Sequence, residues 1–113
     1  MKAIWINAAE RAVQLVDYAG LQDLQRMVGG HLEVACMWHG IGDVLYVDEE
    51  GRLKAPRVWF RMLGLPEVYA GSGVIVGREI GDTARTAPPR LTVAALAPLV
   101  RFAVPLEDIL RGR

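Results

Sequence analysis

The sequence predicts an α+β fold: a single domain with a mixed or antiparallel sheet of about five strands and two or three short helices. A chain of 113 residues is long enough for one hydrophobic core and too short for two. Hydrophobic residues make up 52% of it and charged residues 23%, which is typical of a packed globule. Glycine and proline divide the chain into short apolar runs. We expect residues 1–104 to form the domain and residues 105–113 a C-terminal tail that could add a helical turn.

The first 38 residues predict three strands and one helix. Residues 3–6 form an apolar run typical of a buried strand, and residues 12–18 alternate weakly and are expected to pair with it. Residues 21–28 have helical spacing, and Gly29 follows as a left-handed helix stop. Residues 31–38 alternate between apolar and polar positions and predict a half-buried strand.

The middle of the chain predicts strands, a tight turn and a second short helix. Residues 44–47 are expected to form a strand, and residues 47–53 a hairpin in which Gly51 takes a positive φ. Residues 58–63 predict a short helix, residues 74–76 a compact strand and residues 81–90 a polar loop.

A last helix is expected near the C-terminus. Thr92 is a good N-cap residue, because its hydroxyl can accept a hydrogen bond from a free backbone N–H of the first turn. Pro98 removes one helical hydrogen bond, so we expect a kink or two short helical pieces. The apolar positions of this helix are Leu96, Leu99, Val100 and Ala103.

The periodic apolar positions predict one shared core. Cys36 belongs to it as a small buried hydrophobe, and as the only cysteine it excludes a disulfide within the chain. The predicted core residues are Ile4, Ile6, Leu24, Val28, Val34, Cys36, Leu45, Val47, Ile75, Leu96 and Val100.

Charge and hydropathy limit the classes of partner and the cellular location that we expect. Thirteen basic and thirteen acidic residues leave no net charge, which makes nucleic acid an unlikely principal partner. No apolar run approaches the ~18 residues that a membrane helix needs. We therefore expect a soluble cytoplasmic protein.

The acidic run Asp48-Glu49-Glu50 is the first candidate for chemistry. Three consecutive carboxylates at the end of a strand point in alternating directions and do not converge on one ion. No second acidic or histidine-rich cluster supplies further ligands. We expect a solvated structural turn, with no metal, no cofactor and no catalytic residue, while an enzyme acting through these acids stays an alternative.

A group of aromatic and arginine residues is the better candidate for a ligand site. Trp38, Arg57, Trp59 and Arg61 all border predicted loops. An indole offers a stacking face and a guanidinium pairs with phosphate or carboxylate, so the expected ligand is a small anion with an aromatic part. Packing of the same residues in and around the core is the alternative.

Five motifs resemble a family of small proteins common in phages and mobile elements, domain of unknown function 3846. They are Val28-Gly29-Gly30, Leu32-Glu33, Asp48-Glu49-Glu50-Gly51, Gly73-Val74-Ile75-Val76-Gly77 and Leu91-Thr92, and they span most of residues 1–103. The resemblance implies an α+β fold and a phage or mobile-element setting, and with it a location in the host cytoplasm if a phage encodes the protein, but it implies no activity.

Two positions depart from the family pattern. Asp48 stands where members often have Asn, and the step Pro56-Arg57-Val58 lacks the Asn that usually follows the proline. If that amide contacts a shared ligand, the site is altered in this chain.

These observations leave three interpretations of function. The first is a non-enzymatic binding protein that captures a host protein or a small anionic, nucleotide-like ligand. The second is a structural or assembly module acting as a homodimer, because the apolar content is high for this length. The third is a small enzyme that uses the acidic run.

Overall fold

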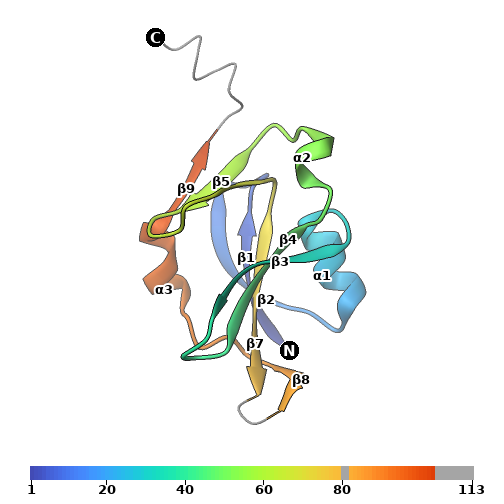
Figure 1. The fold of residues 1–113 in the computed structure, drawn as a ribbon, viewed down its shortest axis with the longest axis vertical. Helices are drawn as coiled ribbons and strands as arrows, with labels where there is room; N and C mark the ends of the chain where they lie inside the picture. Colours follow the sequence, from blue (N-terminus) through green and yellow to red (C-terminus); the bar gives the residue numbers. More distant parts are fainter. Residues whose placement is uncertain (80–81, 104–113) are drawn as a thin grey trace.

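The computed structural model describes residues 1–79 and 82–103 and shows an α+β fold built on two antiparallel sheets (Figure 1). The larger sheet has the order β2-β1-β7-β4-β3, and β8 pairs with the far end of β7. All its pairings are antiparallel, which agrees with the predicted fold class. Its strands are β1 (Lys2–Asn7), β2 (Ala12–Asp17), β3 (Leu32–Trp38), β4 (Asp43–Asp48), β7 (Gly73–Glu79) and β8 (Asp82–Ala87).

A smaller sheet and three short helices complete the fold. The small sheet has the order β6-β5-β9 and is also antiparallel. Its strands are β5 (Trp59–Met62), β6 (Val68–Ala70) and β9 (Val100–Ala103). The helices are α1 (Leu21–Val28), α2 (Gly51–Lys54) and α3 (Val93–Leu96), and a 3₁₀ turn (Ala97–Leu99) follows α3. None of the helices within the described residues is long and apolar enough to cross a membrane.

The large sheet is covered on both faces, so the single predicted core is in fact two clusters. One face packs against the small sheet and α3, and the other against α1. This division follows from the strand period, because successive side chains point to opposite faces. The first cluster contains Ile4, Ile6, Leu45, Val47, Phe60, Met62, Tyr69, Ile75, Leu96 and Val100. The second contains Ala3, Tyr18, Leu24, Val28, Val74 and Val76.

Two of the predicted core positions, Val34 and Cys36, are wrong because of a β-bulge in β3. The register between β3 and β4 shifts between Val34 and Cys36, which interrupts the alternation that the sequence suggests. Val34 is consequently 48% exposed, and Cys36 is only half-buried at the edge of the first cluster.

The α1 helix forms as predicted. Leu24 and Val28 are buried against the large sheet, and Gly29 ends the helix with φ of 95°. The Gly29 N–H donates to the Gln25 carbonyl at 2.8 Å, which satisfies one of the free carbonyls of the last turn. Trp5 Nε1 on β1 donates to the Met27 carbonyl at 3.0 Å and fixes the helix end against the sheet.

The predicted hairpin over residues 47–53 is wrong, although its exposed acids are confirmed. The chain leaves β4 and turns directly into α2, and both Glu49 and Glu50 are exposed. Gly51 does not have a positive φ; the left-handed residue is Ala55, with φ of 47°. Glycine is needed at Gly51 for space, because a Cβ there would lie 3.0 Å from the Ala70 carbonyl oxygen.

The predicted helix over residues 58–63 is strand β5. Phe60 and Met62 are buried and Arg61 between them is exposed, so the segment alternates with period two. Similarly, Val100–Ala103 is strand β9 and not the end of a helix. The N-cap is confirmed, since the Ala95 N–H donates to Thr92 Oγ1 at 3.1 Å. Two short helical pieces around Pro98 are confirmed as well.

Residues 81–90 were expected to form a loop, but Asp82–Ala87 is strand β8. It extends β7 into a hairpin that projects from the body of the molecule (Figure 1). The C-terminal tail of residues 105–113 lies outside the described residues.

Candidate functional site

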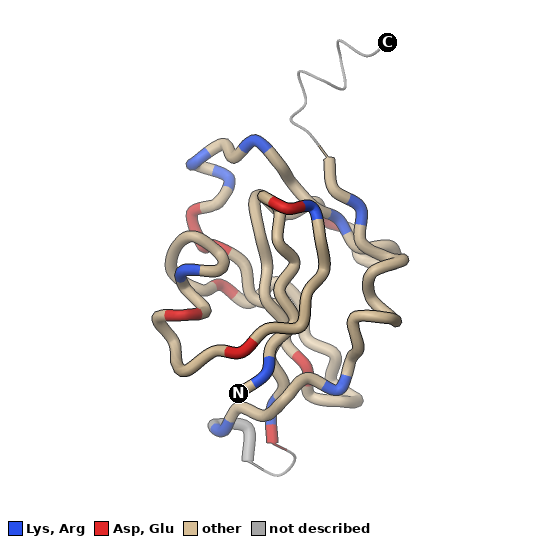
Figure 2. The backbone as a smooth tube through the Cα atoms, turned by 180° about the vertical axis from the view of Figure 1, so that it is seen from behind, with Lys and Arg blue, Asp and Glu red and all other residues tan. Residues whose placement is uncertain are grey.

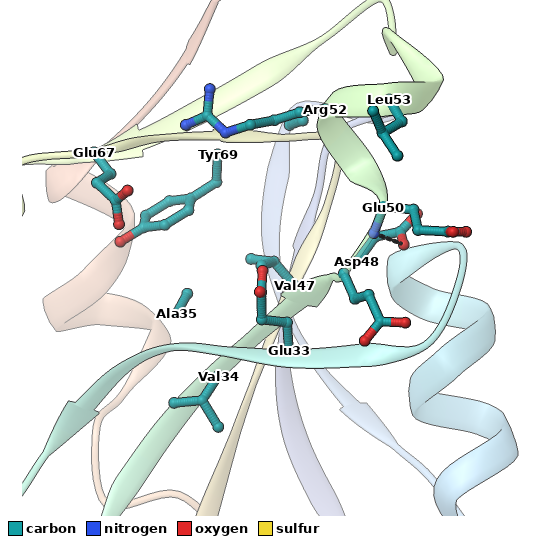
Figure 3. Close-up of a pocket in the computed structure, with 12 residues that line it drawn as sticks. Glu33, Val34, Ala35, Val47, Asp48, Glu50, Arg52, Leu53, Glu67 and Tyr69 are labelled. Carbon is teal, nitrogen blue, oxygen red and sulfur yellow. Dashed lines mark hydrogen bonds between the residues drawn. The ribbon is translucent and has the colours of Figure 1, made fainter.

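An acidic pocket of about 270 Å³ lies between β3 and β6, beside the turn into α2. Figure 3 shows carboxylates around it: Glu33 on β3, Asp48 and Glu50 at the turn, and Glu67 beside Tyr69 at the other end. Glu49 also lines it, so five acidic residues border the pocket, and Arg52 is its one basic residue.

Asp48 holds the local structure of this pocket together. Its side chain is 5% exposed, and its carboxylate accepts from the Glu50 N–H at 2.9 Å and from Lys54 Nζ at 2.7 Å. Lys54 Nζ also donates to the Gly29 carbonyl at 2.8 Å, which joins α2 to the end of α1. Gly30 leaves room for this contact, because a Cβ there would lie 2.5 Å from Asp48 Oδ1.

The acidic pocket also contains a tyrosine and an arginine, Tyr69 and Arg52. Tyr69 is 7% exposed; its burial and then the charge of Glu67 raise the pKa of its hydroxyl above the ordinary value. Arg52 Nη2 donates to the Val68 carbonyl at 2.8 Å, and the guanidinium lies 5.4 Å from the Trp59 ring centroid. Within residues 1–79 and 82–103, no three His, Cys, Asp or Glu side chains are grouped to hold a metal ion.

A second, larger cavity is an open basic groove of about 740 Å³. It runs between the β1–β2 turn, the end of α1 and the segments at residues 56–58 and 71–72. Its charged and aromatic lining residues are Trp5, Glu10, Arg11, Arg26 and Arg57. Three arginines thus meet one acid and one indole in this groove.

Hydrogen bonds hold the β1–β2 turn, which lines one side of the basic groove. Asn7 is buried; it donates from Nδ2 to Gln14 Oε1 at 3.1 Å and accepts from the Glu10 N–H at 3.3 Å. The Ala8 N–H donates to Ser72 Oγ at 2.9 Å, which links the β1–β2 turn to the start of β7. These contacts hold the β1–β2 turn that carries Arg11.

The three groove arginines differ in their partners. Arg26 Nη2 pairs with Asp23 Oδ1 at 2.6 Å. The pKa of that carboxyl is lowered, first by its hydrogen bond from the Ala19 N–H and then by Arg26. Arg11 and Arg57 are exposed and form no side-chain hydrogen bond with another described residue, so both guanidinium groups are available to a ligand.

The structure places the four residues expected from the sequence at different sites. Arg57 lines the basic groove, and Trp59 supports it from β5 by donating from Nε1 to the Pro56 carbonyl at 3.0 Å. Trp38 instead lines an apolar pocket of about 220 Å³ with Met62 and residues near α3. Arg61 is exposed on β5 and lines none of these three cavities.

Sequence reasoning missed Trp5, Arg11 and Arg26 as groove residues. For Trp5 a signal was present, because it lies between Ile4 and Ile6 and so points to the face opposite to theirs. Arg11 and Arg26 meet only through tertiary structure, since a turn carries one and a helix the other.

Cys36 shows no feature of a nucleophile. It is half-buried, and burial raises the pKa of its thiol above the ordinary value. A raised pKa keeps the thiol protonated at neutral pH, which slows its reactions.

Comparison with known proteins gives one match. The model of a family described as "Domain of unknown function (DUF3846)" matches residues 1–93. Both the acidic pocket and the basic groove lie within that span. No curated protein and no solved structure matches the chain.

Proposed function

This chain belongs to the family of domains of unknown function DUF3846, and we propose that it is a non-enzymatic binding protein. Its ligand is a small anion with an aromatic part, such as a nucleotide, and the basic groove holds it. The observation that carries this proposal is the meeting of Arg11, Arg26 and Arg57 with Trp5 around one open cavity.

The groove has the size and chemistry for such a ligand. Its volume of about 740 Å³ lies within the ~300–1,000 Å³ range of small-molecule sites. A guanidinium group is planar and pairs with two oxygens of a phosphate at once, and Arg11 and Arg57 have no competing side-chain hydrogen bond to another described residue. The indole of Trp5 offers an aromatic surface beside them.

The charge around the groove favours a small ligand over a nucleic acid. Glu10 lines the groove itself, and Asp23 neutralises much of the Arg26 charge at its end. Figure 2 shows basic and acidic residues interspersed along the backbone, which agrees with a net charge of zero. A polyanion gains little long-range attraction from such a surface.

The two other interpretations have weaker support. An enzyme acting through the acidic run needs Asp48 free, but Lys54 and the Glu50 N–H engage its oxygens. For a homodimer no single observation stands out: the most exposed large apolar side chains within the described residues include Leu15 on β2, Leu21 on α1 and Leu53 on α2.

Isothermal titration calorimetry against a panel of nucleotides and cyclic nucleotides tests the proposal. We expect at least one member to bind with micromolar to millimolar affinity. Arg57→Ala and Arg11→Ala should each weaken that binding about tenfold or more, because each removes a charge-assisted pair with the anion.

Two further variants change residues that do not line the groove. Arg61→Ala removes an equally exposed arginine outside the groove and should leave the affinity unchanged. Trp59→Ala should weaken binding only modestly, through the lost support of Pro56. No binding at millimolar concentration, or binding that survives both Arg11→Ala and Arg57→Ala, contradicts the proposal.

A further inference from the structure

The acidic pocket lies between two strand edges that are unpaired within the described residues. β3 pairs with β4 on one side only, and β6 pairs with β5 on one side only. Both strands line the pocket, through Glu33 to Ala35 on β3 and through Tyr69 and Ala70 on β6. An unpaired strand edge presents backbone N–H and C=O groups that can pair with an added strand.

The charge of the pocket selects for a basic partner. Of the five acidic residues that line it, only Asp48 forms a salt bridge with another described residue. Arg52 forms no salt bridge with these acids, because its guanidinium contacts the Val68 carbonyl and the Trp59 ring, and its single positive charge leaves the carboxylates in excess. Glu33 on β3 and Glu67, which directly precedes β6, approach from opposite sides (Figure 3).

A tyrosine that is mostly buried but directs its hydroxyl into the pocket adds a second observation that points to a ligand. Tyr69 is 93% buried, and Figure 3 shows its hydroxyl directed toward the Glu67 end of the pocket. That hydroxyl has no hydrogen-bond partner among the described residues. The hydroxyl faces the open pocket, so a polar group that enters the pocket can form a hydrogen bond with it.

Apolar side chains border the same surface. Leu53 on α2 is 84% exposed and Val34 on β3 is 48% exposed, and both line the pocket. An extended peptide places alternate side chains on the same face, so basic and apolar residues in turn would meet the acidic pocket and this rim.

We propose that the acidic pocket is a docking site for a basic, extended segment of a partner protein. An Arg or Lys side chain of that segment enters the pocket between Glu33 and Glu67, and its backbone pairs with the free edge of β3. The site is independent of the basic groove, with which it shares no lining residue.

A second copy of this chain fits the surface less well. Antiparallel pairing of β3 with itself would bring two acidic pockets together, and like charges across paired strands repel.

Chemical-shift mapping with a defined peptide tests the proposal. The probe is a blocked hexapeptide of alternating Arg and Val, and the control peptide carries citrulline, a neutral analogue of Arg, at the same positions. We expect the Arg peptide to shift the backbone amide signals of residues 32–36 and 67–70 and to bind at least about tenfold more tightly than the citrulline peptide.

Paired substitutions locate the charge effect. The double variant Glu33→Gln with Glu67→Gln should weaken binding of the Arg peptide about tenfold or more. The matched control is Glu79→Gln with Asp17→Asn, which removes two exposed charges outside both candidate sites and should change the affinity less than about twofold.

Four results would overturn the proposal. They are the absence of binding at about 1 mM peptide, equal binding of the citrulline peptide, equal loss in both double variants, and shifts confined to β2 or to the basic groove. A dimer that gel filtration detects and that the Glu33→Gln and Glu67→Gln changes strengthen would assign the surface to a second copy instead.

Discussion

Three neighbouring acids of this chain have unequal structural roles. Asp48 is almost fully buried and binds Lys54 and a backbone N–H, whereas Glu49 and Glu50 are exposed. Lys54 also donates a hydrogen bond to the Gly29 carbonyl. Gly29 lines the basic groove, whereas Asp48 lines the acidic pocket. The Asp48–Lys54 pair therefore lies between the two candidate sites.

Substituting these acids should separate their roles. Asp48→Asn keeps an acceptor for the Glu50 N–H but loses the ionic contact with Lys54, so we expect a loss of about 1–3 kcal/mol in the free energy of unfolding. The double change Glu49→Gln with Glu50→Gln should cost less than about 0.5 kcal/mol, because exposed charges contribute little. Urea denaturation measures both. A larger loss in the double variant than in Asp48→Asn contradicts the assignment.

The sequence could predict an acidic turn here but not the separate role of Asp48. Asp48, Glu49 and Glu50 are chemically alike, and their distinction depends on Lys54, which α2 brings back to the turn. The candidate ligand site has the same limit. Arg57 was identified from its aromatic neighbours, but the turn and the helix that supply Arg11 and Arg26 meet it only in the folded chain.

At the scale of elements, Asp43 connects β4 with the segment that leads into α3. It is fully buried, and its carboxylate accepts from the Arg90 N–H at 3.0 and 2.9 Å and from the Leu91 N–H at 2.8 Å. The Arg90 side chain donates in turn to the carbonyls of Ile41 and Arg78, at 3.0 and 2.8 Å. One residue pair thus joins β4, β7 and the approach to α3.

Removing the Asp43 carboxylate should loosen that connection. Asp43→Ala leaves two backbone N–H groups without acceptors, and we expect it to cost about 2–4 kcal/mol in the free energy of unfolding. Hydrogen exchange at the Arg90 and Leu91 amides should accelerate by a larger factor than at amides of β1. The control Asp17→Ala removes an exposed carboxylate on β2 and should have little effect. Unchanged protection at Arg90 and Leu91 would show that other contacts hold the segment.

Elements with clear local signals were predictable, and those decided by packing were not. The α1 helix has helical spacing and a glycine stop, and both were confirmed. The segment around Phe60 is short and apolar except for Arg61, so its period is ambiguous from the sequence, and the small sheet decides that it is a strand. Val100–Ala103 is a strand for the same reason, because its partner β5 lies some 40 residues earlier in the chain.

At the scale of the whole molecule, the two hydrophobic clusters share the strands of one sheet. Ile75 and Val76 are neighbours on β7, yet Ile75 belongs to the cluster under the small sheet and Val76 to the cluster under α1. Loss of either cluster exposes one face of the same strands. We therefore expect both clusters to unfold in one cooperative transition.

Two truncations on opposite faces test this coupling. Leu24→Ala in α1 and Phe60→Ala in β5 each remove a buried side chain and should each cost about 2–5 kcal/mol. The control Leu21→Ala truncates an exposed residue of α1 and should cost much less. Urea unfolding should be followed by far-UV circular dichroism and by the fluorescence of a variant that keeps only Trp5, whose indole reports on the α1 face through its bond to Met27.

The decisive comparison is the response of each face to damage on the other. If the sheet couples the clusters, Phe60→Ala lowers the Trp5 transition midpoint as much as it lowers the midpoint seen by circular dichroism, although Phe60 lies on the opposite face. Independent clusters would instead leave the Trp5 transition in place and produce a second, earlier step in circular dichroism. The pairing of β7 with both β1 and β4 favours the first result, because the central strand cannot lose its packing on one face without weakening the ladder that supports the other.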